Sequence, residues 1–158
     1  MAELQYASFF IKDFLFGINV VLVREIITNA QITQVDLSKD YICGLMNLRG
    51  QIVTIIDPSI KIGIGGTNTS AKTKYIILKT SKELQSKGAD NNIIQQSVED
   101  IVGIKIDDIG DIITIDSKEI ELPPANITEV DSKYIVGVVK LKEKLFLLLN
   151  IKNVLNTD

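Results

Sequence analysis

Oxygen atoms of the kind that calcium binds are concentrated in one stretch of the chain, which holds four aspartates: Asp107, Asp108, Asp111 and Asp116. A calcium loop of the EF-hand type needs oxygen ligands at its first, third and fifth positions, followed by a glycine. If Asp107 takes the first position, the third is Ile109, which has no side-chain oxygen. We therefore interpret the aspartates as a solvated strand-and-turn face, and the sequence predicts no metal site.

Nucleophilic and acid–base catalysis find little support in the residue types. The chain contains no histidine, which excludes Ser-His-Asp and Cys-His catalysis, histidine metal ligands and histidine phosphotransfer in this chain. The one cysteine, Cys43, lies between Ile42 and Gly44 and is interpreted as a small buried apolar residue. Glu119 and Glu121 precede a Pro-Pro turn with no cleft in view, so no acid–base pair is assigned. We predict no catalytic residue and no cofactor.

The charge balance argues against binding to phosphate groups. The 17 basic and 20 acidic residues give a net charge of −3, whereas nucleic acids and anionic membranes attract proteins rich in Lys and Arg. Residues 63–66 read G-I-G-G, but no Lys-Ser/Thr pair or helical pattern follows, so we predict a flexible connector. No apolar run approaches the length of a membrane span, and the N-terminus lacks the features of a signal peptide. Together with the single cysteine, this predicts a soluble cytoplasmic protein.

β-Branched residues dominate the apolar part of the sequence. Isoleucine occurs 27 times and valine 12 times, against 6 alanines, a balance that favours strands over helices. Strands are predicted at residues 6–11, 14–23, 51–56, 75–79, 101–106, 112–115 and 144–149. A helical turn is predicted at 117–121 and a terminal helix at 151–155. Residues 81–100 fit either a helix or a strand, and we expect a long excursion with a mobile tip.

The chain carries an internal repeat. Residues 17–28 resemble 103–114, residues 32–36 resemble 127–131, and residues 41–57 resemble 134–150, in the same order. This duplication predicts two units of about five short strands each, and a small closed or half-closed barrel is the arrangement that removes exposed sheet edges. Residues 81–100 then take the place of the tight Lys12-Asp13 turn of the first unit, as an expanded hairpin loop.

The segment Asn47-Leu48-Arg49-Gly50 lies between two apolar runs, where an arginine must reach solvent or a partner. Its counterpart in the repeat, residues 140–143, reads K-L-K-E and has the look of an ordinary charged hairpin. A glycine in the first copy indicates a special backbone turn. The residues alone leave two interpretations open, a functional surface and a structural turn.

Several motifs of this chain resemble the CheW family, the bacterial chemotaxis coupling proteins. They are F-G-I-N-V-V-L-V-R-E-I, I-T-Q-V, Y-I-C-G-L-M-N-L-R-G-Q-I-V-T-I-I-D, V-G-I-K-I-D-D-I-G-D-I and L-L-L-N-I-K-N-V-L, within residues 6–156. Related families carry the same module fused to a receiver or as the regulatory domain of the chemotaxis histidine kinase. Because no receiver, kinase or dimerisation region accompanies it here, the stand-alone adaptor is the best match.

The resemblance implies one domain over residues 1–158, all-β with short helices, in which two small five-stranded β-barrel subdomains pack together. The first subdomain is expected at about 14–72, and the second at about 73–156 with the N-terminal strand 6–12. The implied function is a non-catalytic adaptor that couples the cytoplasmic tips of chemoreceptors (methyl-accepting chemotaxis proteins) to the regulatory domain of the histidine kinase. We expect a monomer in isolation that binds no nucleic acid, does not insert into membranes, and is recruited from the cytoplasm to membrane-associated receptor arrays.

The resemblance also assigns site residues. A groove between the barrels is expected to receive the helical hairpin tip of the receptor, and apolar barrel ends are expected to meet the kinase. Arg49 is the key receptor-binding residue in a set of five: Val23, Asn47, Leu48, Arg49 and Gly50. Two further residues match positions implicated in coupling: Glu25 and Gly44.

The chain departs from the family pattern in three places. Pro58 follows Asp57 where a leucine is usual, Asn150 stands where an aspartate is common, and the 81–100 excursion is longer than typical. The alternative function is a small-barrel module that binds nucleic acid or a small ligand. The net charge of −3 and only 9 aromatic residues, without an aromatic–basic face, count against it. No motif supports a third possibility, an acid-dependent hydrolase.

Overall fold

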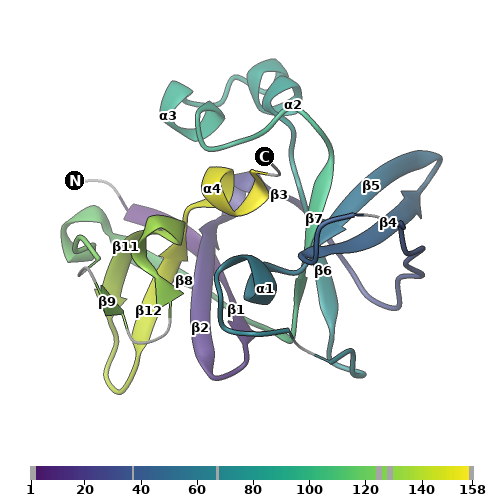
Figure 1. Cartoon of the computed structure of the whole chain (residues 1–158). Coiled ribbons are helices and arrows are strands. Elements are labelled where there is room, and N and C mark those ends of the chain that lie inside the picture. The colour runs from purple at the N-terminus through teal and green to yellow at the C-terminus, as the bar shows by residue number, and fades with distance from the viewer. Residues whose placement is uncertain (1–2, 37, 67, 124–125, 128–129, 157–158) are drawn as a thin grey trace.

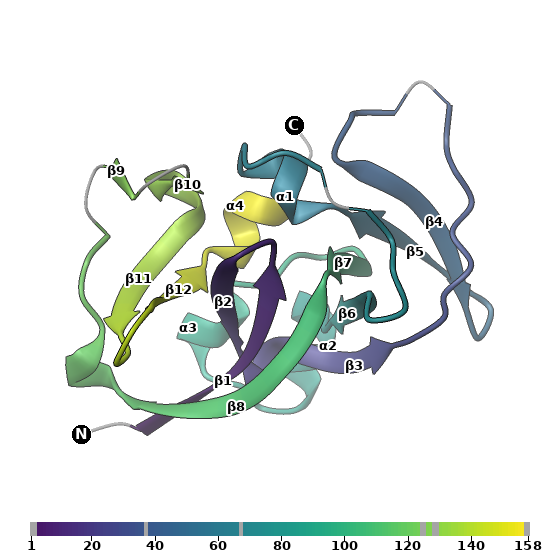
Figure 2. The same cartoon turned by 90° about the horizontal axis from the view of Figure 1, so that it is seen from below.

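Two five-stranded sheets form the body of the protein (Figure 1, Figure 2). The structure, a computed structural model, describes residues 3–36, 38–66, 68–123, 126–127 and 130–156. One sheet has the order β11 (Ile135–Lys140), β12 (Leu145–Leu149), β2 (Phe14–Asn19), β1 (Glu3–Ile11), β8 (Asp108–Asp116). The other has the order β4 (Ile42–Leu48), β5 (Gln51–Ile56), β7 (Val102–Ile106), β6 (Lys74–Leu78), β3 (Val23–Ile27). A small two-stranded ladder pairs β9 (Asn126–Ile127) with β10 (Val130–Asp131).

Short helices fill the space around the sheets. The α-helices are α1 (Pro58–Lys61), α2 (Ser81–Ser86), α3 (Asn91–Ile94) and α4 (Ile151–Leu155), and the 3-10 turns are η1 (Val20–Leu22), η2 (Ser117–Glu119) and η3 (Ser132–Tyr134). In Figure 1, α4 lies between the two sheets, while α2 and α3 stand together at the top. In the part of the chain that the structure describes, no helix has the length and apolar character needed to cross a membrane.

The two sheets have the same strand order when strands related by the internal repeat are matched. The repeat relates β4, β5, β7, β6 and β3 in turn to β11, β12, β2, β1 and β8. In each sheet the second and third strands of this order, β5 with β7 and β12 with β2, pair in parallel, and the other neighbours pair antiparallel. The β6–β7 hairpin carries the 81–100 excursion where β1 and β2 are joined by a tight turn, as we predicted. The topology agrees with a duplicated ancestor unit.

Neither sheet closes into the hydrogen-bonded barrel that we expected. Among the described residues, the edge strands β3 and β4 do not pair with each other, and neither do β8 and β11. At β4 and β11, the segment that leads into the strand takes up some of its edge hydrogen bonds instead. Thr33 bridges Leu45 of β4 with two N···O distances of 2.8 Å, and Glu121 bridges Val138 of β11 with two of 2.9 Å. A single bridge therefore protects part of an edge that a further strand would otherwise cover.

The predicted strand 14–23 is broken at Val20, and the break carries the chain from one sheet to the other. The side chain of Asn19 accepts a hydrogen bond from the Val21 backbone N at 3.0 Å and so caps the η1 turn. β2 before the turn belongs to the sheet of β1, while β3 after it pairs with β6. The sheets thus divide the chain differently from the expected boundaries, since β2 joins the C-terminal strands and β6 and β7 join β3 to β5. The first strand does lie beside C-terminal strands, as expected.

One large apolar cluster joins the two sheets. It contains Phe9 and Phe16 of one sheet and Ile56 and Ile104 of the other, all fully buried, together with the apolar side of α4. Each sheet also has a smaller cluster of its own. Because the largest cluster is shared, neither sheet keeps its core when the other is removed.

We expect the protein to unfold in one cooperative transition. The shared cluster and the two places where the chain passes between sheets couple the stability of both halves. Scanning calorimetry should give a single peak, with equal calorimetric and van't Hoff enthalpies. An isolated 14–72 fragment should not fold, because it lacks β1, β6 and β7. Two separated transitions, or a folded 14–72 fragment, would contradict this.

The 81–100 excursion is helical, where the sequence left a helix and a strand open, and it contributes to the core. It forms α2 and α3, and Leu84 is only 1% exposed within the shared cluster. Ala89, Ile93 and Ile94 pack against the same cluster. The Thr80 hydroxyl accepts a hydrogen bond from the Glu83 backbone N, and the Glu83 side chain accepts one from the Thr80 backbone N, which fixes the start of α2.

The two departures from the family pattern at residues 58 and 150 leave the local structure regular. The Asp57 side chain accepts a hydrogen bond from the Ser59 backbone N at 3.0 Å, and Pro58 occupies the first helical position of α1, where proline is favoured. The repeat counterpart Asn150 caps α4 in the same manner. Asp and Asn are about equally good N-caps, so the exchange costs little.

Candidate functional site

Within the segment 47–50, Arg49 and Gly50 form a two-residue hairpin turn between β4 and β5. Leu48 and Gln51 face each other across the hairpin, and Arg49 and Gly50 have φ of 51° and 87°. Two positive φ angles are typical of the type I′ turn, whose twist matches that of paired strands. The Asn47 side chain accepts a hydrogen bond from the Gly50 backbone N at 2.9 Å. Because this turn prefers Asn, Asp or Gly at its first position, turn geometry does not explain an arginine there.

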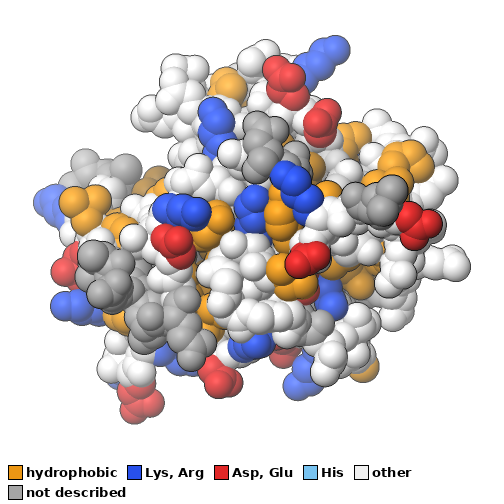
Figure 3. Space-filling model, viewed as in Figure 1, with side chains coloured by type: hydrophobic (Ala, Val, Ile, Leu, Met, Phe, Trp, Pro, Cys, Tyr) orange, Lys and Arg blue, Asp and Glu red, His pale blue; other side chains and the backbone are white. Residues whose placement is uncertain are grey.

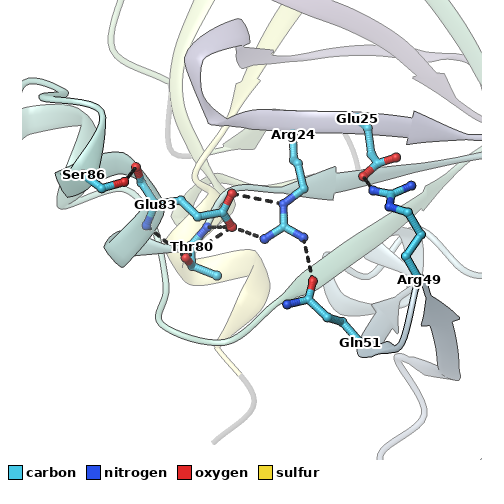
Figure 4. A network of polar contacts seen from close by, with 7 residues as sticks. All are labelled: Arg24, Glu25, Arg49, Gln51, Thr80, Glu83 and Ser86. Carbon is cyan, nitrogen blue, oxygen red and sulfur yellow. Dashed lines mark hydrogen bonds and ion pairs between the residues drawn. The ribbon is translucent and has the colours of Figure 1, made fainter.

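The Arg49 side chain lies on the surface, where it is 68% exposed and donates a hydrogen bond to the Glu25 carboxylate of β3 (Figure 4). β3 and β4 are the opposite edges of their sheet, so the sheet must curve until the turn meets β3. The hydrogen bond to Glu25 and the charge of that carboxylate raise the pKa of Arg49. The guanidinium is therefore charged, exposed and held at one end of the curved sheet.

A second arginine, Arg24, ties the same turn to α2 (Figure 4). Its Nε donates to the Glu83 carboxylate at 3.2 Å, Nη2 bonds the other oxygen of Glu83, and Nη1 lies 3.5 Å from the Gln51 side-chain oxygen. The register of β3 against β6 shifts between Val23 and Glu25, which marks a β-bulge at Arg24. The bulge lets two consecutive side chains, Arg24 and Glu25, reach the β4–β5 hairpin.

Val23 and Leu48, two further predicted receptor-binding residues, pack against apolar clusters. Val23 is half-buried and packs against the shared cluster, and Leu48 is buried in the cluster of its own sheet. A hollow of about 320 Å³ opens beside the turn, and Asn47, Leu48, Met46 and Ile27 contribute to its lining. The structure thus brings Glu25, Asn47, Arg49 and Gly50 together on the surface, next to a hollow lined by both polar and apolar residues.

Gly44 lies away from the turn, at a β-bulge of β4, and its conformation has a local structural cause. Its φ is 148°, and a Cβ atom would overlap the Thr33 backbone carbonyl that bonds to Leu45. The register of β4 against β5 shifts between Ile42 and Gly44. Gly44 therefore lets the segment before β4 approach closely enough to protect that edge.

We expect Gly44→Ala to destabilise the protein by about 2 kcal/mol or more, because it combines an unfavourable φ with a backbone overlap. The free energy of unfolding in urea measures this. Gly66→Ala is the matched control, since a Cβ there meets Ile60 at an ordinary 3.5 Å and should change stability little. An unchanged unfolding free energy with lost partner binding would make Gly44 a contact residue instead.

Three of the four aspartates of residues 107–116 accept hydrogen bonds from backbone N–H groups. Asp107 accepts one from the Lys12 backbone N at 2.6 Å, and Asp108 accepts one from the Ile109 backbone N at 2.9 Å. Asp116 caps the η2 turn. Across the described ranges, no group of three or more His, Cys, Asp or Glu residues could hold a metal ion.

Cys43 is half-buried rather than fully buried as predicted. Burial, and then the nearby charge of Asp57, raises the pKa of this thiol to about 11. The thiol is therefore protonated at neutral pH and is a poor nucleophile.

Sequence analysis missed two residues of the site, Arg24 and Glu83. The pattern Thr80-x-x-Glu83 before Leu84 is a capping-box signature and could have located the start of a helix. Nothing in the sequence pairs this helix with β3, because residues 24 and 83 meet only through the packing of the excursion on the sheets.

Comparisons with known proteins agree on one family. The family model described as CheW-like domain matches residues 5–158. Chemotaxis protein CheW of Klebsiella aerogenes is 27% identical over 143 residues, which cover 90% of this chain and 76% of that protein. Chemotaxis protein CheW of Bacillus subtilis is 26% identical over 143 residues, covering 90% of this chain and 81% of that protein. The crystal structure of the scaffolding protein TtCheW from Thermoanaerobacter tengcongensis matches with a TM-score of 0.76 and 24% identity, over 94% of this chain and 85% of that one.

Proposed function

Because the chain belongs to the CheW family, we propose that it is a non-catalytic adaptor that couples chemoreceptors to the chemotaxis histidine kinase. The adaptor binds the cytoplasmic tips of receptors through the β4–β5 turn and binds the regulatory domain of the kinase through other surfaces. It works as a monomer in the cytoplasm and is recruited to receptor arrays at the membrane.

The observation that carries this proposal is an arginine at a turn position that favours Asn, Asp or Gly. Arg49 keeps a left-handed backbone conformation and a mostly exposed side chain, and Glu25 orients its guanidinium. An exposed ion pair of this kind contributes little to stability. A planar guanidinium can instead form paired hydrogen bonds with carboxylates or backbone carbonyls of a receptor helix.

The surroundings of Arg49 suit a helical partner. The hollow beside the turn is lined by Ile27 and Ala30 together with polar residues such as Asn47, while Met46 and Leu48 are only 4% and 8% exposed. An amphipathic helix buries apolar side chains in such a hollow while its polar side chains meet the charges at the rim.

Exposed apolar residues support a second interface for the kinase. Ile52 on β5 and Leu145 on β12 are exposed at equivalent positions of the repeat, and so are Ile26 on β3 and Ile112 on β8. A kinase domain that carries the same duplicated module has similar exposed ends to pack against them. Ile52 pairs with Asn47 across the β4–β5 hairpin, so Ile26 and Ile52 lie beside the receptor contact, and only Ile112 and Leu145, on the other sheet, are apart from it.

The charges on the face drawn in Figure 3 do not favour binding to nucleic acid. On the face drawn in Figure 3, basic and acidic side chains are interspersed, without a continuous basic stripe. Binding to phosphate backbones depends on such a stripe.

The direct test is assembly of a three-component complex. The full chain is mixed with a receptor cytoplasmic fragment and with the kinase regulatory domain, and the products are separated by size-exclusion chromatography with light scattering. The proposal expects binary complexes with each partner and a ternary complex in which the chain links the other two. Failure to bind the receptor fragment, or binding of the two partners only in competition with each other, would refute the adaptor role.

A further inference from the structure

We propose that Arg24 and Glu83 are positioning residues, through which helix α2 holds the β4–β5 turn in the conformation that binds a receptor helix. This inference rests on the proposed function of the turn and extends the binding machinery to the 81–100 excursion.

The 81–100 excursion can hold the turn in place because it is packed against the core and its first helix is capped. Leu84 of α2 is buried in the cluster shared by both sheets, and Ala89 and Ile93 pack on that cluster from the following residues. The reciprocal hydrogen bonds between Thr80 and Glu83 fix the first turn of α2. The Glu83 carboxylate is therefore presented from a packed and capped helix.

The Glu83 carboxylate is charged in this setting. Partial burial alone would raise the pKa of Glu83, but the hydrogen bonds from Arg24 and Thr80 outweigh it and lower that pKa below its usual value. The Arg24 side chain is only 18% exposed, so its ion pair with Glu83 is shielded more than the Arg49–Glu25 pair. A shielded pair with two hydrogen bonds holds its geometry better than an exposed one.

Arg24 connects the fixed Glu83 carboxylate to the base of the turn. The guanidinium stands on β3, bonds Glu83 of α2 on one side and reaches Gln51 on the other (Figure 4). Gln51 directly follows Gly50, and Glu25 next to Arg24 holds the Arg49 guanidinium. One fork-shaped side chain thus connects α2, β3 and the base of the turn. A non-glycine residue with positive φ, such as Arg49, keeps its conformation only where its surroundings support it.

The test uses the full chain and compares four single variants and the double variant of Arg24→Met with Glu83→Gln. Arg24→Met removes the guanidinium and keeps the apolar stem, and Glu83→Gln removes the charge but keeps an acceptor for the Thr80 backbone N. Thr80→Ala keeps both partners of the Arg24–Glu83 pair but removes the cap of α2 and the hydroxyl that bonds the Glu83 carboxylate. Lys140→Met is the matched surface control, because Lys140 pairs with Glu121 at 3.8 Å on the other sheet.

Two quantities are measured for each variant, the NMR signals of the turn and the affinity for a receptor cytoplasmic fragment. Arg24→Met should shift the backbone amide signals of Gly50 and Gln51 and the side-chain Nε–H signal of Arg49, and should weaken binding about five-fold. Glu83→Gln should shift the same signals by less. The double variant should be no worse than Arg24→Met alone, because both changes interrupt one connection. Thr80→Ala should shift the turn signals by less than Arg24→Met, because the ion pair keeps both partners, and Lys140→Met should change neither quantity.

Unmoved turn signals and wild-type affinity in Arg24→Met would overturn the positioning role while leaving the proposed function intact. Independent, additive losses in the double variant would also overturn it. If the wild-type chain does not bind the receptor fragment, the proposed function fails, and the turn signals alone decide the positioning role. Should Arg24→Met fail to fold, Arg24→Lys retains the charge and stem but cannot span both Glu83 and Gln51, so it should still shift the Gln51 signals.

Discussion

Replacing Arg49 with alanine is expected to weaken binding to a receptor cytoplasmic fragment by about thirty-fold, the scale of an interface hot spot. The melting temperature should change by less than about 2 °C, because the side chain is exposed and its ion pair with Glu25 is a surface pair. Isothermal titration calorimetry measures the affinity for the receptor fragment, and thermal unfolding of the same samples measures the melting temperature.

Arg49→Asn separates the effect of the side chain on receptor binding from its effect on stability. Asparagine fits a positive φ better than arginine, so this variant should melt at the wild-type temperature or above it and still lose receptor binding. Arg49→Lys should recover only part of the affinity, because an ammonium group lacks the planar fork. Wild-type affinity in Arg49→Asn would refute the role of the side chain. A melting temperature several degrees lower in Arg49→Ala would make Arg49 a structural residue.

Shortening residues 81–92 to an Asn-Gly turn is expected to destabilise the fold severely. The excision removes Leu84 from the shared cluster and Glu83 from Arg24. Leu84→Ala alone should cost about 3 kcal/mol, which corresponds to a melting temperature lower by roughly 10 °C for a chain of this size. Differential scanning calorimetry checks both changes.

Lys82→Ala provides the control from the same helix, since Lys82 is exposed and lies two residues from Leu84. It should melt within about 1 °C of wild type. If the Asn-Gly variant keeps the wild-type melting temperature, the excursion is a dispensable loop and the packing of Leu84 is not part of the stable core.

The repeat and many of the strands could be predicted because they depend on local pattern, but β3, β4 and β11 were not among the predicted strands. The run 51–56 is a strand and 151–155 a helix with the predicted bounds, since β-branched content and helical spacing act within a few residues. The break after Asn19 was missed because it depends on one side chain capping a turn inside an apolar run. That single break decides which sheet each half of the run joins, so the sheets divide the chain at other points than the predicted subdomain bounds.

The site was predictable to the extent that it lies within one hairpin. Asn47, Arg49 and Gly50 stand together because four consecutive residues make the turn. The position of Gly44 at a separate bulge depends on Thr33, eleven residues earlier, and the link from Arg24 to Glu83 depends on packing between segments 59 residues apart. Contacts of that range leave no periodic trace in the sequence, and only the folded chain brings them together.

The central claim is that receptors bind at the β4–β5 turn, and NMR mapping with an unlabelled receptor cytoplasmic fragment tests it most directly. The labelled full chain is titrated, and chemical-shift changes are followed for every assigned amide and for the Arg49 guanidinium. The predicted result is that the largest changes fall on Glu25, Asn47, Arg49 and Gly50 and on the residues lining the hollow beside them. Chemical-shift changes that are confined to the other sheet, around β11, β12 and β8, and absent from the β4–β5 turn would contradict the claim.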